Sequence, residues 1–156
     1  MNNEDFHITL KPGTGSVWTP RYDELDLHNS AREVHEVWPE FRYEHEIPTC
    51  APARHYSETN LIWETSESLF HVAFGMSEGP EDEVSVSMWF SYGSSRALYL
   101  PFCDVAAFVM RRFNLVCHCA EGYPPDLRDA PREIEDPDRL RDILVPSMDY
   151  GQSHFP

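Results

Sequence analysis

Residues 84–92 place a large apolar side chain at every second position. The even-numbered positions are Val, Val, Met, Phe and Tyr, whereas the odd-numbered positions are three serines and Trp89. Successive side chains of a β-strand point to opposite faces of its sheet. The segment therefore predicts a strand with one buried face and one solvated face, which is typical of an antiparallel sheet. Trp89 is expected on the solvated face.

Further strand-like segments lie on either side of this one. Residues 60–65 and 69–76 are separated by a short polar turn, and residues 96–100 follow the turn at residues 93–95. Four successive strands joined by short turns predict an antiparallel meander, which Pro101 is expected to end. Weaker strand patterns occur at residues 6–10, 41–47 and 115–120.

Three segments have helical patterns. The most regular is residues 102–113, where apolar side chains recur at the spacing of one helix face. Residues 23–38 predict a second helix, with a break expected near residues 28–30. A third helix is expected after Asp136, because an Asp cap followed by Pro137 is a helix-start signal. It is expected to end at Val145 and Pro146 and to be followed by an irregular tail.

These elements predict one domain covering residues 1–156, since 156 residues is an ordinary length for a single domain. The predicted class is α+β, with an antiparallel meander sheet of four to six strands and two or three helices packed on one face.

Composition excludes several classes of protein. The chain has 27 acidic residues against 12 Lys and Arg, a net charge of -15, which argues against direct binding to nucleic acid. No apolar run approaches the roughly 18 residues of a membrane span, and the start of the chain has no signal-peptide pattern. The expected location is the cytoplasm, with no membrane partner and with the four cysteines mostly reduced and buried.

No motif identifies a catalytic or metal site. Cys117, His118 and Cys119 are potential metal ligands, with Cys103 and His71 expected nearby, but a single Cys-x-Cys lacks the second knuckle of structural zinc sites. The signatures of serine hydrolases, zinc deaminases and nucleotide-binding loops are also missing. We therefore expect no metal, no cofactor and no enzymatic activity.

The distribution of charge is more informative. No Lys or Arg lies between Arg54 and Arg96, whereas this span holds seven acids and two tryptophans. An outward tryptophan within an acidic, serine-lined surface resembles a protein interface, with an aromatic anchor and a charged rim. The alternative is that the chain's own helices cover this face. The candidate partner-binding residues are Glu58, Trp63, Glu64, Glu67, Glu78, Glu81, Asp82, Glu83 and Trp89.

The leading functional hypothesis is an acidic protein-binding module. Such a domain would act as an immunity-type inhibitor that blocks a basic toxin or nuclease, because opposite charge accelerates association and aromatic anchors slow dissociation. One alternative is a nucleic-acid mimic of the anti-restriction or anti-CRISPR type. The other is a small hydrolase whose site is assembled from distant residues such as His55, His71 and His118.

Overall fold

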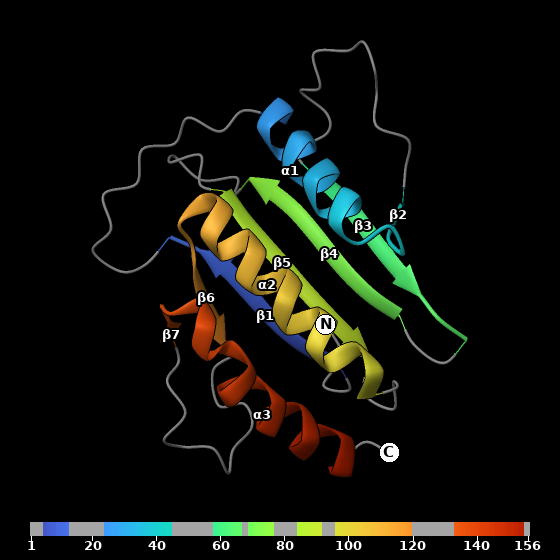
Figure 1. Cartoon of the computed structure of the whole chain (residues 1–156), viewed down its shortest axis with the longest axis vertical. Coiled ribbons are helices and arrows are strands. Elements are labelled where there is room, and N and C mark those ends of the chain that lie inside the picture. Colours follow the sequence, from blue (N-terminus) through green and yellow to red (C-terminus); the bar gives the residue numbers. More distant parts are fainter. Residues whose placement is uncertain are drawn as a thin grey trace.

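The computed structural model of the chain describes residues 5–12, 24–44, 58–66, 69–76, 84–91, 96–119 and 133–154. Within these residues the chain forms one antiparallel sheet of seven strands and three α-helices (Figure 1). The strands are β1 (Asp5–Lys11), β2 (Arg42–Tyr43), β3 (Glu58–Glu64), β4 (Leu69–Met76), β5 (Val84–Ser91), β6 (Val116–Cys119) and β7 (Glu133–Ile134). The helices are α1 (Glu24–Val37), α2 (Tyr99–Phe113) and α3 (Leu140–His154), with 3-10 turns η1 (Arg96–Leu98) and η2 (Pro137–Arg139).

The sheet order is β2-β3-β4-β5-β1-β6-β7. The hairpin of β3 and β4 and the following strand β5 agree with the predicted meander. The first strand of the chain then inserts beside β5, with Phe6 opposite Phe90 and Leu10 opposite Val86. This insertion places β1 inside the sheet. The sheet has seven strands in place of the expected four to six, and the short strand β7 was not predicted.

The prediction of a strand at residues 96–100 was wrong. Residues 96–98 form a 3-10 turn, and α2 begins at Tyr99. The buried side chains of Leu98, Phe102 and Val105 show the reason, because their spacing continues the apolar face of α2 backwards. Pro101 lies in the first turn of this helix, where its missing N–H leaves no helical hydrogen bond unmade.

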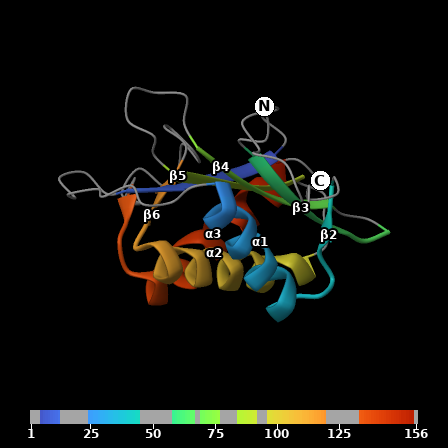
Figure 2. The ribbon, with the colours of Figure 1, turned by 90° about the horizontal axis from the view of Figure 1, so that it is seen from above.

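All three helices lie on one face of the sheet (Figure 2), and the predicted α+β class with helices on one face is confirmed. Helix α2 crosses the middle of the sheet and α1 packs on β3 and β4. At the centre of the core, the Phe102 ring lies 5.5 Å from Phe6, 5.1 Å from Phe70 and 5.3 Å from Phe90, measured between centroids. These contacts connect the helix to three different strands.

Helix α3 is longer than predicted. The side chain of Asp136 accepts a hydrogen bond of 2.9 Å from the Asp138 N–H, but it caps the 3-10 turn η2, which leads into α3 at Leu140. The helix does not end at Pro146, however, and continues to His154. Leu144 and Met148 are buried on either side of this proline, so their burial compensates for the missing hydrogen bond.

Helix α1 is continuous over residues 24–37, without the expected break, and Ser30 is buried within it. The strand predicted at residues 41–47 is present as Arg42–Tyr43, and its last residues lie outside the described part of the chain. Among the helices that the structure describes, none has the length and apolar character needed to cross a membrane.

Truncating Phe102 tests the packing of α2 on the sheet. Phe102→Ala removes a fully buried ring with three aromatic neighbours, so the free energy of unfolding is expected to fall by about 3–5 kcal/mol in urea denaturation. The matched control is Leu100→Ala on the exposed side of the same helix, with an expected change within about 0.5 kcal/mol. Equal losses in the two variants would contradict this orientation of α2.

Candidate functional site

The face of the sheet opposite the three described helices is called the helix-free face here. Strand alternation places on it the side chains that alternate with the core positions of each strand, and two of these, Ile62 and Ala73, are themselves buried. Its most regular row crosses β3, β4, β5 and β1, where Ile62, His71, Trp89 and His7 are neighbours in register. Around this row lie small or polar side chains, namely Thr9, Asn60, Ala73, Ser85 and Ser87.

Trp89 is held in place by His71. The two rings stack with centroids 4.0 Å apart and planes at 22°, and the His7 ring lies 6.2 Å from Trp89 on the other side. The His71 Nε2 lies 2.9 Å from the Asn60 Oδ1, an acceptor, so Nε2–H donates this hydrogen bond. The Glu44 carboxylate is 4.0 Å from the same nitrogen. The Trp89 ring is therefore partly exposed and is fixed by stacking on His71, which a hydrogen bond to Asn60 holds in place.

Trp89 lies where the alternation predicts, on the face that no described helix covers. Trp63 does not share that face. Its ring meets Phe41 edge to face at 5.4 Å and lies 6.4 Å from Phe70, on the side of the sheet that the helices cover. A single surface of the sheet therefore cannot present both tryptophans, which the sequence hypothesis grouped together.

Among the predicted acidic positions, Glu64 has a described side chain. It is exposed at the β2–β3 edge and forms an ion pair of 3.2 Å with Arg42. Glu58 lies in β3 opposite Gly75, and nothing is described of its side chain. The remaining predicted acids lie outside the described residues: Glu67, Glu78, Glu81, Asp82 and Glu83.

The sequence patterns did not single out Asn60 or Glu44, and His71 was considered as a possible metal ligand or catalytic residue. Period-two alternation gave the signal for Asn60 and His71, because both precede or follow buried positions of their strands. What the sequence lacked was the register that places His71 directly opposite Trp89. Glu44 follows the two-residue strand β2, which is too short to show a pattern.

Among the residues weighed as metal ligands, the structure describes the side chains of His71, Cys103, Cys117 and His118. Cys117 points into the core and His118 lies on the opposite face, as strand alternation predicts. Across the described ranges, no three His, Cys, Asp or Glu side chains come close enough to hold a metal ion. Burial, with a smaller contribution from Asp104, raises the pKa of the Cys103 thiol to about 12, so this thiol stays protonated at neutral pH.

His118 has an unusual environment. Its Nε2 is buried and has no hydrogen-bond partner in the described part of the chain, whereas the ring does bond the Pro12 backbone. The bond to Pro12 therefore comes from Nδ1. Burial first, and the nearby charge of Lys11 second, lower the pKa of His118. The imidazole is consequently mostly neutral at pH 7.

Chemistry of the kind expected for a small hydrolase would need a pocket in which a histidine meets a carboxylate. A groove of about 650 Å³ on the outer side of the helices is lined by Trp38, Asp104, Ala107, Phe108, Arg111, Arg112 and Arg141. This groove contains no histidine. His71 and Glu44, which do approach each other, are separated by more than a hydrogen bond.

Comparison of the chain with models of known protein families, with curated proteins and with solved structures finds no match in any of the three.

The environment of His118 predicts a pH dependence of stability. Because its pKa in the folded protein lies below the ordinary 6.5, folding favours the neutral ring. This contribution to the free energy of unfolding is complete above about pH 6.5 and is lost as the pH falls toward the folded pKa. Urea denaturation at about pH 7.5 and about pH 5.5 should show a smaller loss on acidification for His118→Asn than for the unmodified protein. Equal losses would contradict this account of His118.

Proposed function

We propose that this protein is a binding module that holds a basic protein partner against the helix-free face, with Trp89 as the anchor. The proposal rests on one observation: a partly exposed Trp89, stacked on His71, lies on a sheet face that no described helix covers. Tryptophan is among the residues that most often dominate the energy of a protein interface.

The surroundings of Trp89 favour a protein partner. The stack on His71, itself bonded to Asn60, fixes the indole ring before any partner arrives. Binding then costs less conformational entropy than it would for a freely rotating side chain. The neighbouring Ser87 and Thr9 are short, so they leave room for a partner to pack beside the ring.

The charge of the chain supports a basic partner. Five arginines are already paired with carboxylates inside the described structure: Arg42 with Glu64, Arg96 with Asp149, Arg111 with Asp138, Arg112 with Glu33 and Arg141 with Asp104. Each pair removes one charge of each sign, so the excess of 15 negative charges is unchanged. That excess attracts a cationic protein over a distance and repels a phosphate backbone.

The partner class that fits is a basic toxin or nuclease, which the module would inhibit by covering its active site. We place this activity in the cytoplasm, where the buried thiols of Cys103 and Cys117 stay reduced. Nucleic-acid mimicry has less support, because an aromatic anchor such as Trp89 favours a mixed protein interface over a surface of regularly spaced carboxylates. No observation favours the hydrolase alternative over binding.

The test is affinity capture followed by substitution of single tryptophans. The tagged protein is incubated with host extract at low salt and eluted with a salt gradient, and we expect one stoichiometric basic protein. Trp89→Ala should weaken the purified complex by about 2 kcal/mol or more, roughly 30-fold in Kd. The same change should lower the free energy of unfolding by only about 1 kcal/mol, because the ring is partly exposed.

The matched control is Trp38→Ala, which removes a partly buried tryptophan on the helix side of the molecule. It should leave the affinity for the basic partner unchanged. The proposal fails if Trp38→Ala weakens that complex as much as Trp89→Ala does, or if Trp89→Ala leaves it intact. A large loss of stability in Trp89→Ala would show that the ring belongs to the core.

A further inference from the structure

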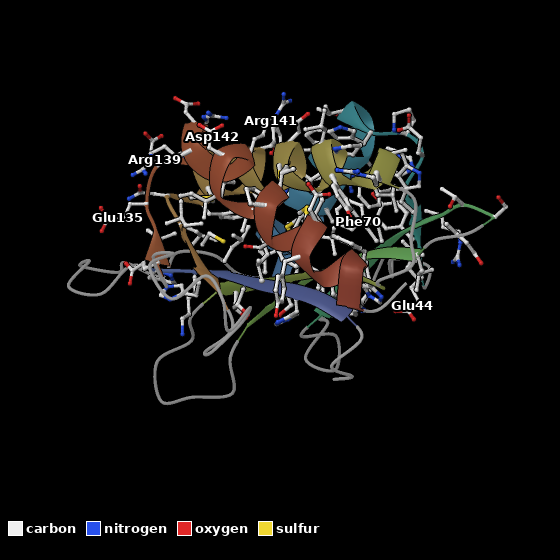
Figure 3. The ribbon with its side chains drawn as sticks, turned by 90° about the horizontal axis from the view of Figure 1, so that it is seen from below. Glu44, Phe70, Glu135, Arg139, Arg141 and Asp142 are labelled. Carbon is white, nitrogen blue, oxygen red and sulfur yellow. The ribbon has the colours of Figure 1, made fainter. Side chains whose placement is uncertain are left out.

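The outer side of the helix layer carries a groove whose lining holds three arginines and one acid, Asp104. Helix α2 supplies most of its lining, α3 contributes Arg141, and Trp38 follows the end of α1. In Figure 3, Arg141 lies on the side of the helices away from the sheet. The groove and the helix-free face are therefore on opposite sides of the molecule, and one bound partner would not cover both.

The base of the groove is apolar. The Trp38 indole meets the Phe108 ring edge to face, with centroids 5.6 Å apart and planes at 85°, and Ala107 lies beside them. Two large apolar side chains of the described residues are strongly exposed, Val37 at 54% and Leu100 at 49%. Val37 directly precedes Trp38, and Leu100 lies one helical turn before Asp104 of the groove lining. Exposed apolar surface thus adjoins this groove, as is usual at binding sites.

The rim of the groove carries three guanidinium groups, a quarter of the 12 Lys and Arg in the chain. Each is paired with a carboxylate of the chain itself. The Arg112 Nε lies 2.8 Å from Glu33, the Arg141 Nη2 lies 2.6 Å from Asp104, and Arg111 bonds Asp138. All three arginine side chains are 38–55% exposed.

These pairs leave the arginines able to bind a second anion. An arginine has five N–H donors, and the pairs in the groove use one or two of them on each side chain. Exposed ion pairs of this kind contribute little to stability, so an incoming carboxylate can share or replace the internal partner. Because every existing partner is a carboxylate, the arginines already have the geometry for carboxylate recognition.

We propose that this groove is a second docking surface, which binds a short acidic peptide segment carrying a large apolar side chain. The apolar side chain packs on Trp38 and Phe108, and the flanking carboxylates bind Arg111 and Arg141. The net charge of -15 opposes a long polyanion such as nucleic acid. At physiological salt the Debye length is about 8 Å, so the acids of the chain that lie far from the groove are largely screened from a short segment.

This inference does not depend on the proposed function, since it concerns a different surface and a partner of opposite charge. If both are correct, the protein is an adaptor that holds a basic protein on one side and an acidic segment on the other.

The experiment follows the indole N–H signals of the ¹⁵N-labelled full chain by NMR at about 0.15 M salt. The probe is a capped hexapeptide in which four glutamates flank a phenylalanine and a leucine. We expect saturable movement of the Trp38 signal, assigned with Trp38→Phe, and no movement of the Trp89 signal. Replacing the glutamates by lysines, or the two apolar residues by serines, should abolish the shift.

Arginine variants test which groups hold the peptide. The double variant Arg111→Gln with Arg141→Gln should weaken peptide binding by about tenfold or more, because two charge-assisted contacts are lost. The matched control is Arg96→Gln, which removes an exposed arginine also paired with a carboxylate of α3 but outside the groove lining. Its peptide affinity should equal that of the unmodified protein.

Several results would overturn the inference. One is that the peptide does not move the Trp38 indole signal, or that it moves the Trp89 signal instead. Another is that Arg96→Gln weakens peptide binding as much as the double variant does. If a double-stranded DNA oligonucleotide moved the Trp38 signal more than the peptide does, the ligand of the groove would be nucleic acid and not an acidic peptide. The dispersed amide spectrum of each variant confirms its folding, and if the double variant unfolds, the single Arg111→Gln change carries the test.

Discussion

The burial of one face of a seven-stranded sheet under three helices is the constraint on which the rest of this structure depends. Phe102 is central to it, since its ring contacts aromatic side chains of β1, β4 and β5 at once. Helix α2 is thereby fixed across the middle of the sheet, with α1 and α3 packed beside it. Most of the aromatic side chains that the structure describes pack in this layer, and Trp89 is an exception.

One-sided burial produces two surfaces of different chemistry. On the sheet side, short polar side chains surround a tryptophan stacked on a histidine. On the helix side, the spaces between α1, α2 and α3 form a groove with an aromatic base and an arginine rim. A chain with a net charge of -15 thus concentrates three of its few cations at one place, and it pairs them with carboxylates of α1, α2 and η2.

Local patterns predicted much of this architecture, and non-local contacts decided the rest. The alternation in residues 84–92 correctly placed Trp89 opposite the core, because the apolar positions of a single strand show which of its side chains face the core. Residues 61–63 are all apolar and do not alternate with polar residues, so the sheet face on which Trp63 lies could not be predicted. The insertion of β1 beside β5 and the continuation of α3 through Pro146 depend on burial against distant segments. The groove exists only where three helices meet, and no single segment of sequence encodes it.

The central claim is that the helix-free face around Trp89 binds the basic partner. Hydroxyl-radical footprinting of the protein, free and in complex with the captured partner, tests it most directly, because oxidation reports the solvent exposure of each tryptophan. If the partner binds the helix-free face, the complex protects Trp89 from oxidation and leaves Trp38 as reactive as in the free protein. Protection of Trp38 with unchanged oxidation of Trp89 would contradict the claim and would place the basic partner on the helix layer.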